Sequence, residues 1–343
     1  MATIKDVALH AQVSVTTVSH VVNRTRFVSD QARARVQAAI EELKFVPSAL
    51  ARSLRNNCTK TVGMMIPNCS NPYFAEIVRG IEDTFFEAKF NVILCNSDDN
   101  PSKQAQYIRV LHEKQVDGLI VLSSGGDDEL VSLLRAVDVP KVLVDREVDE
   151  LAVDLVEVNH EVGGYLAMKH LLGLGHRRVA CITGPLTLSS ALQRLQGSRR
   201  ALHEAGQAAD PPYEATGDFT SEGGYAAMRR LLLLPRPPTA VFACNDLMAI
   251  GAICAAASIG LRIPKDLSVI GFDDIALAAF SSPPLTTISQ PKHQLGELAA
   301  RLLLDRIAKP GRKLRREILQ PNLCLRESTS EPAPDPGTKR KRQ

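Results

Sequence analysis

Residues 3–23 read Thr-Ile-Lys-Asp-Val-Ala-Leu-His-Ala-Gln-Val-Ser-Val-Thr-Thr-Val-Ser-His-Val-Val-Asn, a pattern that predicts two short helices joined by a tight turn. Thr3 can cap the first helix, and Asp6, three residues later, completes an acidic variant of the capping box. Ser14 can cap the second helix, because its hydroxyl can accept a hydrogen bond from a free backbone N–H of the first turn. The first helix has one apolar face, formed by Ile4, Val7, Ala8 and Ala11.

The second helix has an inward face of branched apolar residues and an outward face of short polar ones. The inward residues are Val18, Val21 and Val22. The outward residues are Thr16, His20 and Asn23, with Val15 at the edge of this face. Such a row of small polar groups suits the major groove of DNA, where base edges present a code of hydrogen-bond donors and acceptors. The alternative is an ordinary helical hairpin whose polar face is simply solvated.

A third helix is expected over residues 30–44, and Pro47 ends this small helical unit. Residues 49–56 could add one further helix, but eight residues are too few to be stably helical alone. This segment could therefore fold only on its target. Leu54 lies on an apolar face beside arginines that include Arg55, as an apolar wedge in the minor groove would require. From spacing alone, a plain linker is an equally good interpretation.

The net charge of +3 conceals an uneven distribution of charge along the chain. Residues 1–60 contain nine Lys/Arg and four Asp/Glu, a net charge of +5, and residues 339–342 add +4. The remainder of the chain therefore carries a net charge of −6. A basic N-terminal segment on a mildly acidic body indicates a polyanionic partner for that segment.

The seven cysteines are an odd number, and they have neither C-x-x-C spacing nor an accompanying histidine cluster. We expect reduced, mostly buried thiols and no metal site. The N-terminus carries Lys5 and Asp6 and lacks the apolar core of a signal peptide. The longest weakly polar run, residues 247–258, is too short to span a bilayer. These features predict a soluble cytoplasmic protein with no membrane partner.

Sequence motifs give little support for catalysis. The chain contains no Gly-x-Ser-x-Gly elbow, no phosphate-binding Gly-rich loop and no cluster of metal ligands. Gly173-Leu-Gly175 resembles half of a dinucleotide-binding fingerprint, but it precedes an expected strand and lacks the third glycine. We therefore expect neither an enzyme nor a bound cofactor.

From Thr61 the pattern changes to apolar strand-like runs separated by helical stretches, as in doubly wound parallel sheets. The expected strands are residues 61–67, 91–95, 118–122, 141–144, 179–183, 240–243, 267–271 and 285–289. These strand–helix units together are longer than one ordinary domain, and we therefore expect two α/β lobes. A helix over residues 291–307 and a strand over residues 316–325 return to one of the lobes. The Pro- and charge-rich residues 328–343 are typical of a disordered tail.

Polar and aromatic side chains follow the ends of several expected strands. In open α/β sheets, ligands bind beyond the carboxyl ends of the strands, so we expect these residues to line one cleft. The set comprises Asn71, Tyr73, Phe74, Asp145, Arg146, Phe219, Asn245, Asp273 and Gln290. Amides, carboxylates and a guanidinium can form hydrogen bonds with hydroxyl groups, and aromatic faces can pack on C–H surfaces. This combination suits a polyhydroxylated ring. Taken singly, many of these residues could instead form turns or belong to the core.

These segments resemble the LacI family of transcriptional repressors. The N-terminal matches are Ile4-Lys-Asp-Val-Ala8, Val13-Ser-Val-Thr-Thr-Val-Ser-His-Val-Val-Asn23 and Ala49-Leu-Ala-Arg-Ser-Leu54. The body matches in Val269-Ile-Gly-Phe-Asp-Asp-Ile275 and Leu285-Thr-Thr-Ile-Ser-Gln-Pro-Lys292. Within the family, Cys181-Ile-Thr-Gly-Pro-Leu186, Thr216-Gly-Asp-Phe219 and Phe280-Ser-Ser-Pro-Pro-Leu285 look most like ribose-type repressors, with purine-type repressors next. The resemblance covers the chain up to about residue 327.

The resemblance implies an α + α/β protein that binds a palindromic operator as a homodimer and responds to a small effector. Its parts would be a helix-turn-helix headpiece (1–46), a hinge helix and linker (47–60), a two-lobed periplasmic-binding-protein-like effector-binding and dimerisation domain (61–327) and the basic tail (328–343). The implied DNA contacts are Val15, Thr16, Thr17, His20, Asn23, Leu54 and Arg55, with Leu54 wedged into a central CG step. The strand-end residues match the implied effector cleft, to which Arg194 is added.

Two positions depart from the family patterns and bear on the effector. Leu192 stands where ribose-type repressors have a sugar-gripping arginine, and Leu188 stands where purine-type repressors have an arginine. We expect a sugar such as ribose that acts as an inducer, with a purine corepressor as the alternative. The alternative from another functional class is a stand-alone sugar-binding or sugar-processing α/β protein. In such a protein, residues 1–56 would have no role.

Overall fold

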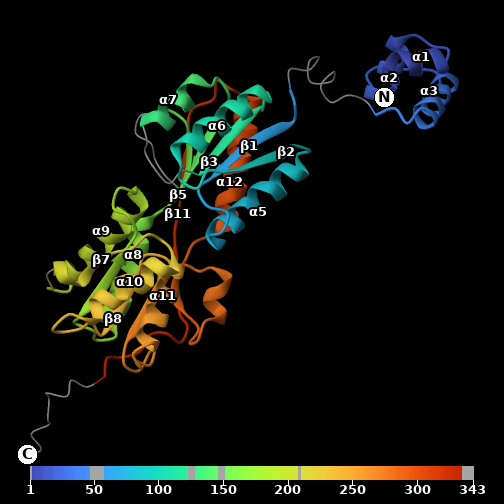
Figure 1. The fold of residues 1–343 in the computed structure, drawn as a ribbon. Helices are drawn as coiled ribbons and strands as arrows, with labels where there is room; N and C mark the ends of the chain where they lie inside the picture. Colours follow the sequence, from blue (N-terminus) through green and yellow to red (C-terminus); the bar gives the residue numbers. More distant parts are fainter. Residues whose placement is uncertain (1, 47–57, 123–127, 146–150, 208–209, 334–343) are drawn as a thin grey trace, which may run out of the picture. The chain divides into compact units, whose positions relative to one another are not determined.

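The computed structural model describes residues 2–46, 58–122, 128–145, 151–207 and 210–333. The chain forms two compact units, one within residues 1–60 and one within residues 61–343 (Figure 1). The expected hinge helix with Leu54 and Arg55, and the expected effector contact Arg146, lie outside the described residues.

The described part of the first unit, the headpiece, contains the helices α1 (Ile4–His10), α2 (Val15–Asn23) and α3 (Asp30–Glu42). The predicted capping box is present, since Asp6 N donates to the Thr3 hydroxyl and Thr3 N donates to the Asp6 carboxylate at 2.7 Å. Ser14 caps α2 by accepting a hydrogen bond from Thr17 N at 3.1 Å. The two helices and the turn between them are therefore where the sequence predicts them.

The core of the headpiece joins the apolar faces of its three helices. Val7 of α1, Val18 of α2 and Val36 of α3 are fully buried. Val21 and Val22 pack against this cluster, which confirms the inward face predicted for α2. The opposite, polar face of α2 consequently points away from the headpiece core.

The second unit, the body, contains two six-stranded sheets, each in a lobe of its own (Figure 1). The first-lobe sheet has the order β11-β5-β4-β3-β1-β2 and is parallel throughout. Its strands are β1 (Thr61–Ile66), β2 (Asn91–Asn96), β3 (Gly118–Leu122), β4 (Lys141–Val144), β5 (Asp154–Val158) and β11 (Arg316–Leu319). The second-lobe sheet has the order β12-β10-β9-β8-β6-β7, with β12 antiparallel to β10. Its strands are β6 (Val179–Thr183), β7 (Glu214–Thr216), β8 (Ala240–Ala243), β9 (Ser268–Asp273), β10 (Thr286–Ser289) and β12 (Asn322–Cys324).

Helices pack on the sheets of both lobes. The first lobe has α5 (Pro72–Glu87), α6 (Pro101–Glu113), α7 (Asp128–Ala136) and α12 (Lys292–Ala308). The second lobe has α8 (His160–Gly173), α9 (Ser189–Glu204), α10 (Ser221–Leu232) and α11 (Asp246–Ala257), with the 3₁₀ turns η1 (Pro211–Tyr213) and η2 (Ala276–Phe280). Within the described ranges, no helix is both long enough and apolar enough to cross a membrane.

The chain passes between the lobes where β5 leads to α8, where β10 leads to α12 and where β11 leads to β12. The first passage sets His160 at the start of α8, and the second sets Gln290 just after β10. These two residues therefore lie at the junction of the lobes.

Strand β5 has no counterpart among the predicted strands, because it carries charged residues at buried positions. Asp154 is fully buried and accepts hydrogen bonds from the guanidinium groups of Arg306 and Arg312 at 3.0 and 2.8 Å.

Short β7 is a second strand missing from the prediction. The single strand predicted over residues 316–325 is instead two strands, β11 and β12, which belong to different sheets.

The predicted start of the disordered tail at residue 328 is wrong. Ser328 is fully buried, and its hydroxyl donates to Val269 O at 2.6 Å and accepts from Thr286 N at 2.8 Å. Ser330 N donates to the hydroxyl of Ser268 at 3.0 Å. The packed chain thus extends through Ser330, because these small polar residues satisfy backbone and hydroxyl groups of the second lobe. Residues 334–343 lie outside the described residues.

Candidate ligand cleft and nucleic-acid interface

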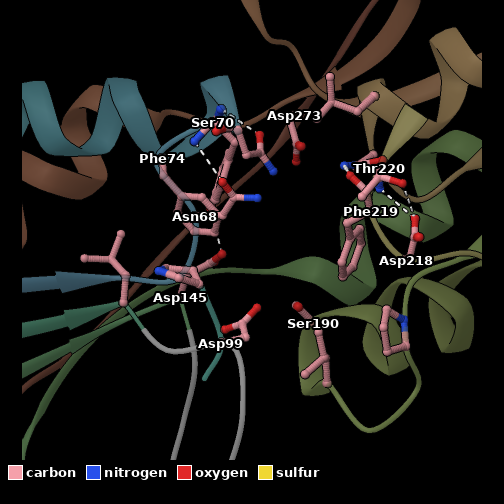
Figure 2. Close-up of a pocket in the computed structure, with 18 of the residues that line it drawn as sticks. Asn68, Ser70, Phe74, Asp99, Asp145, Ser190, Asp218, Phe219, Thr220 and Asp273 are labelled. Carbon is pink, nitrogen blue, oxygen red and sulfur yellow. Dashed lines mark hydrogen bonds between the residues drawn. The ribbon is translucent and has the colours of Figure 1, made fainter. Parts of the chain in front are cut away.

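A cavity of about 340 Å³ is lined by residues of both lobes at the carboxyl ends of their strands (Figure 2). Eight of the ten predicted effector contacts line it: Asn71, Tyr73, Phe74, Asp145, Arg194, Phe219, Asn245 and Asp273. Gln290 is not among the lining residues, but it is hydrogen-bonded to Asp273 at 2.7 Å and lies 3.4 Å from the Tyr73 hydroxyl. The volume is near the lower end of the range for small-molecule sites, which suits a small metabolite.

The start of α5 forms the first-lobe wall of the cavity. Asn71 caps this helix by accepting a hydrogen bond from Tyr73 N at 3.0 Å. The buried Tyr73 hydroxyl donates to Asp145 Oδ2 at 2.7 Å. Burial, together with the carboxylates of Asp145 and Asp273, raises the pKa of Tyr73 well above its ordinary value, so the phenol remains a donor. The Phe74 ring meets the Tyr73 ring edge-on at 5.2 Å and is half-buried.

Asp145 follows β4 and connects the two lobes. Its second carboxylate oxygen, Oδ1, lies 2.9 Å from His160 Nε2. Burial acts to raise the pKa of Asp145, but contacts with His160, Arg194 and Tyr73 outweigh burial and lower it overall. Asp145 is therefore a charged acceptor at neutral pH, and the hydrogen bonds it receives compensate for its burial.

Arg194 of α9 forms the buried centre of the second-lobe wall. Its guanidinium lies over the Phe272 ring, 3.9 Å from the ring centroid. Nη1 donates to Cys244 O at 2.5 Å and lies 3.8 Å from Asp273 Oδ1, and Nε donates to His160 Nδ1 at 3.3 Å. Stacking and hydrogen bonds on several sides fix the guanidinium plane, as recognition of ligand oxygens requires.

Asp273 closes β9 and lies opposite Asp145 in the cleft. Gln290 Nε2 donates to its Oδ1 at 2.7 Å. Burial raises the pKa of Asp273 to about 7, although Arg194, Lys292 and the hydrogen bond from Gln290 lower it. Near neutral pH this carboxyl group is poised between its two protonation states, so a ligand that donates a hydrogen bond can shift the balance.

Phe219 and Asn245 form a further part of the second-lobe wall of the cavity. Asn245 Nδ2 donates to Phe219 O at 2.9 Å, and Asn245 Oδ1 caps α11. The Phe219 ring lies directly on Gly184, where an added Cβ would be 2.1 Å from a ring carbon. Gly184 is therefore needed for the ring to lie flat beside the cavity.

Three cleft residues have left-handed backbone conformations. The φ angles are +63° at Asp145, +66° at Phe219 and +113° at Asp273. Such angles are uncommon for residues other than glycine, and for bulky Phe219 the conformation is costly. Strained residues of this kind cluster at ligand sites, because the strain places a side chain where regular structure cannot. At these three positions the backbone conformation helps to direct the side chain into the cleft.

Sequence reasoning missed several residues that line the cavity or support it. The missed lining residues include Asp99, Ser190, Asp218 and Glu222. Among the described lining residues there are five acidic side chains and one basic side chain, Arg194. This imbalance disfavours phosphate or carboxylate ligands and favours a neutral, hydroxyl-rich one. Leu188 also lines the cavity, whereas Leu192 is 37% exposed and is not among the lining residues.

The predicted DNA-contacting face of α2 lies on the surface of the headpiece. Val15 and Thr16 are exposed, whereas Thr17, His20 and Asn23 are half-buried. His20 Nδ1 lies 2.8 Å from the Thr25 hydroxyl, and Asn23 Nδ2 donates to Ser19 O at 2.8 Å. The first turn of α2 thus presents its most accessible side chains, as recognition helices do at base edges.

The fold and the two sites together define a class of protein, a small helix-turn-helix unit combined with a two-lobed ligand-binding body. Residues 3–48 match the family described as bacterial regulatory proteins, lacI family, and residues 168–329 match a periplasmic binding protein-like domain. The chain belongs to the LacI family of transcriptional repressors, as its relatives confirm.

Similar proteins match along nearly the whole chain. The ribose operon repressor of Escherichia coli K12 is 46% identical over 96% of this chain and 100% of its own length. The HTH-type transcriptional repressor PurR of Photobacterium profundum is 42% identical over 96% of this chain and 99% of its own length. The lac repressor dimer bound to operator and the anti-inducer ONPF is 30% identical, with a TM-score of 0.87 over 96% of this chain and 99% of that one.

Family membership makes the protein a DNA-binding repressor and not an enzyme. It also confirms the predicted fold class of a helix-turn-helix domain followed by a two-sheet α/β body. In the described part of the chain, no group of three or more His, Cys, Asp or Glu side chains is arranged to hold a metal ion.

Proposed function

We propose that this repressor binds a palindromic operator as a homodimer and releases it when a sugar, with ribose as the leading candidate, binds in the cleft. The observation that carries this proposal is the combination, in one chain, of an exposed polar recognition helix and a cleft built for hydroxyl groups. We further propose a cytoplasmic location, because the operator DNA would be bound there.

DNA binding is supported by charge as well as by geometry. Residues 1–60 carry a net charge of +5, while the body is acidic. Positive charge on the headpiece favours the phosphate backbone, and the exposed side chains of α2 can then reach base edges. The proposed base-reading residues are Val15, Thr16, Thr17, His20 and Asn23. Leu54 and Arg55, which lie outside the described residues, are proposed as minor-groove contacts.

Dimerisation is supported by large apolar side chains on the surface of the body. Phe86 and Leu94 of the first lobe are 75% and 47% exposed. Leu277 and Phe280 of the second lobe are 52% and 86% exposed. Exposed apolar groups of this size mark interaction surfaces, and the similar lac repressor is described as a dimer on its operator. A second copy of the chain would cover both sets and pair the headpieces on a palindrome.

A sugar effector is supported by the chemistry of the cleft. Asp145 and Asp273 can accept hydrogen bonds from ligand hydroxyls, and Arg194 can donate to a ring or hydroxyl oxygen. Phe74 and Phe219 offer apolar faces for C–H groups on opposite lobes. The similarity to a ribose operon repressor points to ribose within this class.

A purine corepressor is the second candidate, because the PurR repressor of Photobacterium profundum is also similar along the whole chain. Leu188 and Leu192 stand at the arginine positions of the purine-type and ribose-type patterns, so neither ligand has its full set of partners. The acidic lining favours the sugar, since its many hydroxyl donors match carboxylate acceptors.

Selection of bound duplexes from a random DNA library tests the DNA-binding half of the proposal. The full chain should enrich a palindrome with a central CG step, and D-ribose should then release it in a gel shift. Calorimetry with pentoses, hexoses and purines tests the effector half. A purine that tightens operator binding would replace induction by corepression. Sugar binding without any enriched DNA would instead favour a stand-alone sugar-binding protein.

A further inference from the structure

Six polar side chains form a closed ring of contacts across the two lobes, which we call the cleft ring. In order around the ring they are Tyr73, Asp145, His160, Arg194, Asp273 and Gln290. Five of them belong to the predicted effector site, and the sixth, His160, does not. We propose that His160 is a positioning residue that holds Asp145 and Arg194 together across the lobes and so sets sugar affinity. This inference rests on the proposed sugar-binding function of the cleft.

His160 acts behind the cavity and not in it. It is 2% exposed and is not among the residues that line the cavity. It begins α8 directly after the chain has left β5 of the first lobe, so its imidazole lies at the junction of the lobes. Its Nε2 faces Asp145 of the first lobe at 2.9 Å, and its Nδ1 faces Arg194 of the second lobe at 3.3 Å.

The partners of His160 fix the position of its proton. A guanidinium can only donate hydrogen bonds, so Nδ1 of His160 must accept from Arg194. The ring proton is then on Nε2, where it donates to the carboxylate of Asp145. His160 therefore serves as a neutral donor–acceptor bridge between an anion and a cation, in one defined tautomer.

His160 also determines which Arg194 hydrogens remain for a ligand. Of five guanidinium N–H groups, Nε–H and one on Nη2 are directed at His160 Nδ1, and one on Nη1 donates to Cys244 O. The other Nη1 hydrogen is available to Asp273, whose Oδ1 is 3.8 Å away. Among the described residues, one Nη2 hydrogen has no acceptor and is left for a ligand oxygen. Without the acceptor on His160 the buried guanidinium would turn toward other acceptors, and this donor would be misplaced.

Close packing of α8 and α9 prevents the helices from relaxing around a smaller side chain. An added Cβ on Gly164 of α8 would be 2.0 Å from Arg194 O, and one on Gly197 of α9 would be 1.9 Å from Glu161 O. The two backbones are thus in direct contact just after His160, at Glu161 and Gly164, and at Arg194 itself. The separation between these side chains is consequently set by the helix pair.

Two substitutions separate the two hydrogen bonds of the imidazole, the one it accepts from Arg194 and the one it donates to Asp145. In His160→Asn, the amide oxygen can take the place of Nδ1 and accept from Arg194, but the shorter side chain cannot reach Asp145. In His160→Gln, the amide nitrogen can take the place of Nε2 and donate to Asp145, while the acceptor for Arg194 is lost. His160→Ala removes both contacts. His170→Asn is the matched control, because His170 lies on the same helix but bonds Thr329, remote from the cavity lining.

Calorimetry with D-ribose measures the consequence for binding. The Asn and Gln variants should each bind about tenfold more weakly, and the Ala variant more weakly than either, since each loses a hydrogen bond to a charged group. Operator affinity without sugar should change little in all three variants, which a general loss of folding would not allow. The thermal unfolding midpoint should fall most in His160→Ala, because the buried Asp145 and Arg194 then both lose a partner. Unchanged ribose affinity in His160→Ala, or equal losses in His170→Asn, would overturn the proposal.

A measurement without any ligand separates this inference from the identity of the effector. Ring ¹⁵N chemical shifts should show His160 protonated at Nε2 and unprotonated at Nδ1, and Asp145→Asn should perturb this signature. A ring protonated at Nδ1 would overturn the bridge even if ribose binds. If the wild-type protein does not bind ribose but shows the Nε2–H signature, the choice of sugar fails and the bridge stands.

Discussion

Asp273 gives the sharpest prediction, because its titration is linked to sugar binding. Burial raises its pKa to about 7 in the ligand-free cleft, although Arg194 and Lys292 lower it. A sugar hydroxyl that donates to the carboxylate stabilises the ionised form, so binding releases a proton when the pH is near or below 7. The affinity for D-ribose should therefore rise with pH up to about 7 and be nearly constant above it.

The size of this effect follows from the same pKa. At pH 5, about two units below the pKa of about 7, ionising Asp273 for the ligand costs about 2.7 kcal/mol, because one pKa unit corresponds to about 1.36 kcal/mol. D-ribose should then bind about 100-fold more weakly at pH 5 than at pH 8. Calorimetry in two buffers of different ionisation enthalpy measures both the affinity and the number of protons released.

Asp273→Asn tests whether this group carries the pH dependence. The amide does not titrate, so the dependence should disappear, and affinity at pH 8 should fall by about 1.5–3 kcal/mol with the loss of a charge-assisted hydrogen bond. Asp218→Asn is the matched control, since Asp218 also lines the cavity and its replacement should leave the slope in place. Equal affinities of the wild-type protein at pH 5 and pH 8 would refute the reasoning, as would an unchanged slope in Asp273→Asn.

The same substitution has an opposite consequence for stability without ligand. Because the folded pKa of Asp273 is raised to about 7, its stabilising contribution is present below the ordinary aspartate value and is lost as pH rises through about 7. Asp273→Asn should therefore raise the unfolding midpoint of the ligand-free protein at pH 8 more than at pH 5. A lower midpoint at pH 8 would show that the carboxylate is not destabilising.

Further predictions concern the headpiece, the second lobe and the specificity of the cleft. Thr16→Ala or His20→Ala should cost about 1–3 kcal/mol on the selected operator and little on random DNA; equal losses on both would exclude base reading. Burial lowers the pKa of His176, so the stability it contributes is present above about pH 6.5 and lost as pH falls. Urea unfolding at pH 7.5 and 5.5 should accordingly show a smaller acid loss for His176→Gln than for the wild type, and an equal loss would disprove the linkage. Leu192→Arg should tighten D-ribose binding if its longer side chain reaches the cavity, which Leu192 itself does not line, and unchanged affinity would show that it does not restore the arginine contact of ribose-type repressors.

The headpiece was predictable because its signals are local. Thr3, Asp6 and Ser14 cap helices through residues within three positions, and these contacts are present. The spacing of Val18, Val21 and Val22 fixes the buried side of α2. The polar face, and hence the choice of DNA-contacting residues, follows from the same periodicity.

The cleft was predictable in outline for a topological reason. Parallel strands bring their carboxyl ends to one edge of a sheet, so the residues that follow different strands meet there. Asp145 after β4 and Asp273 at the end of β9 lie in this way in one cavity, although they are far apart in the sequence. The helix-borne Arg194 is not at a strand end and entered the prediction only through the family resemblance.

The features that escaped prediction depend on contacts between distant parts of the chain. His160 gains its role only because Asp145 and Arg194 meet on either side of its ring. Strand β5 looks too polar for a buried strand until Arg306 and Arg312 neutralise Asp154. Ser328 is likewise packed because it satisfies groups of β9 and β10. In each case the compensating group is more than ten positions away, beyond the reach of local patterns.

Induction requires that the sugar site of the body be coupled to the operator site of the headpiece. Linkage requires that D-ribose change operator affinity by the same factor by which operator changes ribose affinity. The direct measurement is therefore ribose calorimetry on the free protein and on its complex with the selected operator, beside operator titrations with and without saturating ribose. We expect weaker binding by equal factors of about 5–150 in the two experiments. Ribose affinity that is identical with and without operator would contradict the coupling.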